Sequence, residues 1–133
     1  MANALYSKGR QGFLDGSIDF DTDDIRAILI DTADYTVNLS THDNLDDVAA
    51  AARVATSDAL ASKTATDGTA DAADKTFTAV SGDTVEAIIL YKHTGTESTS
   101  RLIAYIDTGT GLPVTPNGGD ITVAWNASGI FTL

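Results

Sequence analysis

The sequence predicts a mainly β fold, an antiparallel β-sandwich-like domain with one short N-terminal helix. Segment 84–133 contains four short apolar segments of strand length, separated by turn-forming residues. Short strands and frequent turns are typical of packed antiparallel sheets. The chain has 133 residues, 43% of them hydrophobic, so it can bury a core without metals or disulfides. Because no linker or repeat divides it, we predict one domain, 1–133, with a helix or arm at 1–16 and a sheet domain at 25–133.

The N-terminal segment 2–14 has the amphipathic spacing of a short helix. Asn3 is positioned to cap its start and Gly16 to end it. Gly9 and Gly12 lie inside this helix, and each weakens it by about 1 kcal/mol relative to alanine. We therefore expect the helix to depend on docking, as an arm that becomes ordered against a neighbouring molecule.

Residues 19–24 are rich in aspartate, a feature shared with calcium-binding loops. An EF-hand loop needs glycine at its sixth position and glutamate at its twelfth, and here those positions hold Asp24 and Ile30. The EF-hand interpretation fails, and an acidic turn before a strand is the better account. A looser oxygen site for a divalent cation at this turn stays open.

The first half of the predicted sheet domain contains two strands, at 25–30 and 35–39, with a loop at 31–34 between them. Residues 42–48 are predicted to form one helical turn that covers an end of the sheet. Region 49–74 is rich in Ala, Thr, Ser and Asp and has few large apolar residues to fix its register. We expect edge strands or extended loops there.

In the second half, residues 75–80 alternate polar and apolar side chains and return to the core, and 85–92 is apolar on both faces near its centre. A further strand is predicted at 101–106, after which glycines and prolines, Gly109 and Gly111 among them, break the chain. Ile121, Val123 and Trp125 then point to one side. Residues 126–129 have the composition of a hairpin turn, so 130–133 is predicted to return antiparallel to that strand.

The net charge is −11, from 19 acidic and 8 basic side chains. Such a surface repels phosphate backbones, so nucleic-acid binding is not predicted. Solubility at high local concentration explains the charge better than an acidic face matched to a basic partner. The absence of cysteine excludes a disulfide framework, thiol catalysis and cysteine-bound zinc. No apolar run is long enough for a membrane span, and the N-terminus lacks the pattern of a secretory signal.

No catalytic residue, metal ligand or cofactor site is predicted. His42 and His93 are the two histidines, and a metal site built from both would require a long-range coincidence. Paired carboxylates such as Asp46 and Asp47 are expected by chance among so many acidic residues, although a glycosidase that uses paired aspartates is an alternative. We predict that the protein is not an enzyme.

Four segments resemble a family of small virion structural proteins of tailed bacteriophages. They are 2–10 (ANALYSKGR), 33–39 (ADYTVNL), 94–108 (TGTESTSRLIAYIDT) and 111–123 (GLPVTPNGGDITV), and together they extend over nearly the whole chain. The resemblance implies a structural component of the phage particle, without catalytic residues. A capsid decoration or cement protein, which binds the outer surface of the assembled head and stabilises contacts between major capsid protein subunits, is the favoured role.

On this hypothesis the partners are the major capsid protein and sister copies, with a homotrimer as the expected assembly. The expected partner-binding residues are in the N-terminal arm: Leu5, Tyr6, Arg10, Phe13 and Leu14. Region 49–74 is a second candidate for these contacts.

Two alternatives are a tail, baseplate or fibre-associated virion protein and a carbohydrate- or receptor-binding module. The latter requires exposed aromatic side chains, namely Tyr35, Tyr91, Tyr105 and Trp125. Their alternation with aliphatic residues favours burial instead.

Overall fold

The computed structural model describes residues 4–107 and 112–133. Asn3, Gly109 and Gly111, to which the sequence assigns a helix cap and chain breaks, lie outside these ranges. The described residues form ten β-strands, one α-helix and three short 3-10 helices, and every strand pair is antiparallel. The predicted fold class is confirmed: the protein is mainly β and sandwich-like, with one short N-terminal helix.

The elements follow one another along the chain as β1 (Ala4–Leu5), α1 (Ser7–Asp15), β2 (Ile25–Ile30), η1 (Leu45–Asp47), η2 (Ala50–Ala52), β3 (Arg53–Thr56), β4 (Thr64–Thr66), β5 (Thr69–Asp71), β6 (Lys75–Phe77), β7 (Ala87–Lys92), η3 (Glu97–Thr99), β8 (Leu102–Ile106), β9 (Ile121–Val123) and β10 (Phe131–Thr132).

A five-stranded sheet with the order β1-β8-β7-β2-β3 lies at the centre of the molecule. Its three inner strands, β8, β7 and β2, are almost entirely buried because both faces of the sheet are covered. Ile88 and Leu90 of β7 point to one face, whereas Ile89 and Tyr91 point to the other. This arrangement confirms the prediction that the segment is apolar on both faces.

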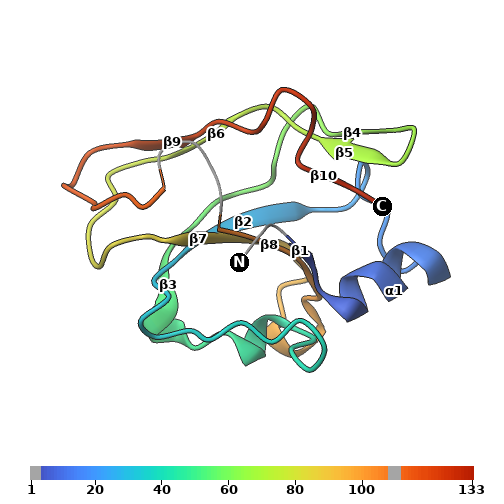
Figure 1. Cartoon of the computed structure of the whole chain (residues 1–133), viewed down its shortest axis with the longest axis horizontal. Coiled ribbons are helices and arrows are strands. Elements are labelled where there is room, and N and C mark those ends of the chain that lie inside the picture. Colours follow the sequence, from blue (N-terminus) through green and yellow to red (C-terminus); the bar gives the residue numbers. More distant parts are fainter. Residues whose placement is uncertain (1–3, 108–111) are drawn as a thin grey trace.

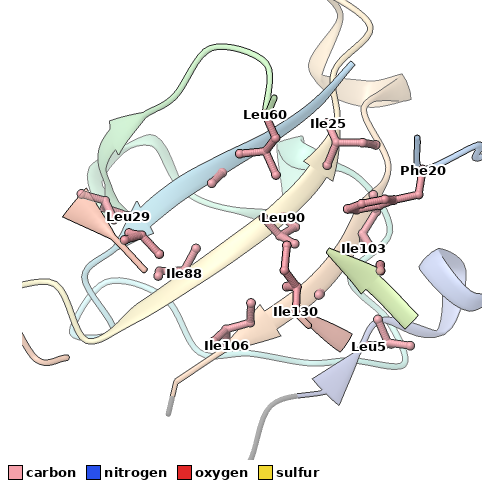
Figure 2. Packing of buried hydrophobic residues seen from close by; sticks show 14 of the residues in the cluster. Leu5, Phe20, Ile25, Leu29, Leu60, Ile88, Leu90, Ile103, Ile106 and Ile130 are labelled. Atoms are coloured by element: carbon pink, nitrogen blue, oxygen red, sulfur yellow. The ribbon is translucent and has the colours of Figure 1, made fainter. Parts of the chain in front are cut away.

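The first face is covered by two small sheets, β10-β5-β4 and β6-β9, which form the upper layer in Figure 1. Apolar side chains from the central sheet fill the space beneath this layer, together with Phe20, Leu60 and Ile130 from the segments above or beside it (Figure 2). This is the main core of the sandwich.

The second face is covered by the segment 31–52, which runs below the central sheet in Figure 1. Leu45 and Val48 are buried against the sheet. Arg53 holds the segment in place, because its guanidinium donates hydrogen bonds to the carbonyl oxygens of Leu45 (2.8 Å) and Val48 (2.6 Å) and pairs with the Glu97 carboxylate (2.9 Å).

Several sequence predictions are confirmed. The strands predicted at 25–30, 85–92 and 101–106 correspond to β2, β7 and β8, and the helical turn in 42–48 is η1. Region 49–74 contains two edge strands, β3 and β4, as predicted, but also β5, the middle strand of the three-stranded sheet, and the 3-10 helix η2, which were not predicted.

The N-terminal helix begins later than predicted. α1 starts at Ser7, and the residues before it form β1, which pairs with β8. Leu5 enters the main core from this strand, and the Tyr6 amide donates to the Ile103 carbonyl oxygen (2.9 Å), so pairing with the sheet replaces the first helical turn. Gly16 ends the helix in the left-handed conformation (φ 80°), as predicted.

The strand predicted at 35–39 is wrong. These residues run as a loop beneath the sheet, and their alternating apolar side chains, Tyr35, Val37 and Leu39, pack onto the second face. The pattern reported burial on one side, which a loop can provide as well as a strand.

The predicted C-terminal hairpin is also wrong. Residues 126–129 do form a turn, with the Gly129 amide donating to the Asn126 carbonyl oxygen (2.9 Å), but the two flanking strands do not pair. β9 pairs with β6, and β10 pairs with β5. Ile130 explains the divergence, because it is buried in the main core and its amide donates to the Ala70 carbonyl oxygen (2.7 Å).

Candidate interaction surface

The helix α1 lies directly on β8, at one edge of the domain. Gly9 and Gly12 are its buried residues. A Cβ atom at Gly9 would lie 2.8 Å from the Ile103 carbonyl oxygen, so only glycine allows this close approach without movement. The helix is therefore ordered against its own sheet, and the glycines that weaken it in isolation are the residues that let it dock.

A first hollow, of about 400 Å³, opens between the two layers next to α1. Apolar residues from three strands form most of its wall. The lining residues are Ala4, Leu5, Ala104, Ile106, Ile130, Phe131 and Thr132, together with Arg10 of α1. Its volume lies within the range of small-ligand and side-chain pockets.

A second hollow, of about 370 Å³, lies on the other side of Phe131. Phe13, Phe20 and Leu133 are among its lining residues. The Phe131 ring contacts those of Phe13 and Phe20, with centroid distances of 5.8 and 5.6 Å. These distances are typical of stabilising aromatic pairs, so Phe131 is a fixed ridge between the two hollows.

The large apolar side chains most exposed in the described chain lie on the elements that border these hollows. Leu14 is 88% exposed at the end of α1, and Leu133 is 59% exposed beside β10. We define the α1–β10 surface as Arg10, Phe13, Leu14, Phe131, Leu133 and the two hollows. Exposed apolar side chains close to hollows are typical of interaction sites.

The charged side chains of the α1–β10 surface differ from those of the rest of the protein. Arg26, Arg53, Lys75 and Lys92 form ion pairs with acidic side chains. Lys8, Lys63 and Arg101 donate to Gln11, to the Asp23 carbonyl oxygen and to Ser17, respectively. Arg10 is the one basic side chain that has no hydrogen-bond or ion-pair partner within the described residues.

The structure brings four of the five predicted partner-binding residues to this surface. Leu5 and Arg10 line the first hollow, Phe13 lines the second, and Leu14 is exposed beside them. Tyr6 is fully buried on the opposite face of the central sheet and cannot contact a partner.

Residues of the C-terminal segment complete the surface, and the sequence prediction missed them. Phe131 and Leu133 join α1 through the pairing of β10 with β5. Their only sequence signal is an apolar pair at alternate positions, which does not identify the neighbouring element.

Tyr6 takes part in a buried hydrogen-bond chain. Its hydroxyl lies 2.8 Å from the Tyr35 hydroxyl, which lies 2.8 Å from His42 Nδ1. Burial raises the pKa of Tyr6 above its ordinary value and raises the pKa of Tyr35 to about 12. Both hydroxyls are therefore neutral at physiological pH, and the chain joins segment 31–44 to the residue that precedes α1.

The two histidines, which the sequence analysis did not expect to form a metal site, lie apart in the structure. His42 bonds to Tyr35, whereas His93 lies near Tyr91, with its Nδ1 3.4 Å from that hydroxyl. Asp47 of the paired carboxylates accepts from the Asp43 amide (2.7 Å) and stabilises the start of η1. These residues have local structural roles.

The acidic turn before β2 is confirmed as a turn. The Asp23 carboxylate accepts from the Asp19 amide (2.8 Å) and pairs with Lys92 (3.2 Å), while Asp24 pairs with Arg26 (3.0 Å). The hydrogen bond from Arg26 lowers the pKa of Asp24. Two of the turn's carboxylates thus have cationic side chains of this chain as partners.

A different carboxylate group is close enough to hold a cation. Asp31, Asp34 and Asp83 offer oxygen atoms within 4.8 Å of one another, with Asp31 buried and the other two exposed. Asp31 also accepts from the Ala33 amide (2.9 Å), which explains its position at the start of the loop. The sequence did not indicate this cluster, since Asp83 comes from a distant turn.

The aromatic residues that a carbohydrate-binding module would expose are mostly in the interior. Tyr35, Tyr91 and Tyr105 are buried in the second face of the sheet. Trp125 is partly buried, and its Nε1 donates to the Ala73 carbonyl oxygen (3.0 Å). The expectation that most of these rings are buried is confirmed.

No family model matches the sequence, and no curated protein is significantly similar to it. Within the described residues, no helix has the length and apolar character needed to cross a membrane.

Proposed function

We propose that this protein is a non-enzymatic structural component of a tailed-bacteriophage virion and decorates the outer surface of the capsid. The α1–β10 surface carries the proposal, because it presents exposed apolar side chains on a well-packed β domain. The resemblance of four segments of the sequence to small phage virion proteins supports the assignment to the particle.

The α1–β10 surface would attach the protein to the shell. Leu14 and Leu133 are largely exposed in the single chain, and burying a leucine side chain contributes about 1.5–3 kcal/mol. A ligand that binds only the assembled shell stabilises that shell by its binding free energy. Modest contacts repeated over many sites would therefore suffice to join neighbouring major capsid protein subunits.

The acidic remainder of the surface fits the same role. A net charge of −11 keeps free copies soluble before attachment. On the head, we expect sister copies to meet as a homotrimer about a local threefold axis, because closed symmetric assemblies match the symmetry of the shell.

The position of the protein in the particle can be tested directly. Purified virions would be labelled with a gold-conjugated antibody raised against this chain, and the gold particles over heads and tails counted separately. Dense label over heads is the expected result. Label confined to tails would refute the capsid role and identify a tail, baseplate or fibre-associated protein.

The role of the surface is tested by rebinding. Heads that lack the protein would be incubated with the wild-type chain, with Leu14→Glu, or with Ala124→Glu, a control at an exposed position directly after β9. We expect Leu14→Glu to weaken attachment by at least about tenfold, since it places a charge where the proposed contact with the capsid would bury an apolar side chain. Ala124→Glu should bind as the wild type does. Equal binding by both variants would exclude Leu14 from the contact.

A further inference from the structure

The first hollow of the α1–β10 surface lies between two strand edges. β1 is an edge strand of the five-stranded sheet, and β10 is an edge strand of the three-stranded sheet. Residues of both strands line the hollow, together with Ala104 and Ile106 of β8. Edge strands present unpaired backbone groups that can bond to an added strand.

The hollow is lined by apolar and polar surface together, and one cationic side chain belongs to its lining. Leu5, Ile106, Ile130 and Phe131 contribute aliphatic and aromatic surface, and Arg10 of α1 contributes the charge. Every other basic side chain of the described chain has an internal partner. Within the described residues, Arg10 has no acidic side chain as a partner although the protein carries a net charge of −11, so its guanidinium is available to an external anion.

We propose that this hollow docks an extended segment of a partner chain, which inserts a bulky apolar side chain and pairs a neighbouring carboxylate with Arg10. Arginine binds carboxylates through two parallel hydrogen bonds, so one Asp or Glu side chain satisfies it. The segment is expected to be extended because a strand can be added to the edge of a sheet, and β1 and β10 are both edge strands.

Charge favours a different protein over a second copy as the partner. Two chains that each carry −11 repel one another at long range, whereas a less acidic chain with a local carboxylate does not. This inference rests on the proposed function in one respect, namely that the partner is a segment of the capsid protein. Binding in the hollow can be tested without virions, so the binding proposal and the capsid role can be refuted independently.

The test uses a display library of random linear peptides, selected against the full-length protein. Affinities of enriched peptides would be measured for the wild type and three variants. Arg10→Gln removes the cation, Lys8→Gln removes an equal charge elsewhere on α1, and Ala4→Trp fills the hollow. Thermal unfolding would confirm that each variant is folded, and Arg10→Lys would retain the charge without the paired geometry.

The expected peptides share a large apolar side chain close to an Asp or Glu. They should bind Arg10→Gln at least about tenfold more weakly than the wild type, bind Lys8→Gln equally well, and lose binding to Ala4→Trp. Arg10→Lys should lie between the wild type and Arg10→Gln.

Three results would overturn the proposal. They are the absence of enriched peptides, equal affinity for Arg10→Gln and the wild type, and binding that persists in Ala4→Trp. Sedimentation of the wild type and of Arg10→Gln tests whether a second copy of this chain occupies the hollow. Self-association that depends on Arg10 would identify a second copy as the occupant and would refute the proposed partner.

Discussion

Replacing Gly9 with alanine should destabilise this protein, although alanine is the better helix former. A Cβ atom at this position would lie 2.8 Å from the Ile103 carbonyl oxygen, 2.9 Å from the Ile103 Cα and 2.9 Å from the Leu102 carbonyl oxygen. All three are backbone atoms of β8, in the central sheet, and cannot rotate away as a side chain can. α1 must therefore move outward to accept the methyl group.

Two opposing effects set the magnitude of the change. In an exposed helix the substitution would stabilise by about 1 kcal/mol, because alanine loses less backbone entropy. Forcing an extra carbon into a close contact costs about 1–3 kcal/mol, and moving α1 also loosens Phe13 against Phe131. We expect a net decrease of about 1–3 kcal/mol in the free energy of unfolding.

Gly12 provides an internal comparison. Its added Cβ would lie 2.4 Å from Cδ1 and 2.6 Å from Cγ1 of Ile18, but these are side-chain atoms, which can shift more easily than the backbone of β8. Gly12→Ala should therefore destabilise less than Gly9→Ala. Gln11→Ala, at an exposed position of the same helix, should leave stability almost unchanged.

Urea unfolding followed by circular dichroism measures all three variants. If Gly9→Ala matched or exceeded the wild type while Gln11→Ala stayed neutral, α1 could not lie as close to β8 as described. The order Gly9→Ala, Gly12→Ala, Gln11→Ala, from most to least destabilised, is the pattern that the backbone contact requires.

Two further predictions concern hydrogen bonds and charge. Tyr35→Phe leaves the buried Tyr6 hydroxyl without its partner and should lower the free energy of unfolding by about 1–3 kcal/mol in urea titrations. Tyr105→Phe should cost less, because the Tyr105 hydroxyl has no hydrogen-bond partner among residues 4–107 and 112–133. The pKa of Asp24 is lowered in the folded state by its hydrogen bond from Arg26, so the stability from this pair is present at neutral pH and is lost as the pH falls below about 5. Unfolding curves measured from pH 7 to pH 3 should show a shallower loss for Arg26→Gln than for the wild type, and parallel losses would contradict the assignment.

The central strands could be predicted from the sequence because burial on two faces leaves a local signature. Segments 25–30, 87–92 and 102–106 are runs of strand length that are apolar except for Arg26 and Lys92. The alternation at 35–39 was equally clear but described a loop packed on one face, since side-chain burial does not report backbone pairing. Pattern therefore identified the core reliably and the hydrogen-bond partners less well.

Strand order could not be predicted, because it depends on contacts between distant segments. Nothing near Phe131 in the sequence indicates that β10 pairs with β5, which lies much earlier in the chain. The same limit applied to the glycines of α1. Gly9 was interpreted from helix propensity alone, and its true role depends on Ile103, which is distant in sequence.

The α1–β10 surface separates the residues that hold its elements in place from the residues available to a partner. Gly9 fixes α1 against β8, and Ile130 fixes β10 in the main core, both by inward contacts. Leu14 is 88% exposed on the same helix, and the Arg10 side chain has no hydrogen-bond or ion-pair partner within the described residues. Outward substitutions should therefore change binding while leaving the unfolding free energy nearly constant, whereas Gly9→Ala should reduce both, because moving α1 alters the rim of each hollow. If Leu14→Glu destabilised the fold as much as Gly9→Ala does, Leu14 would contribute to folding. It would then not be available to bind a partner.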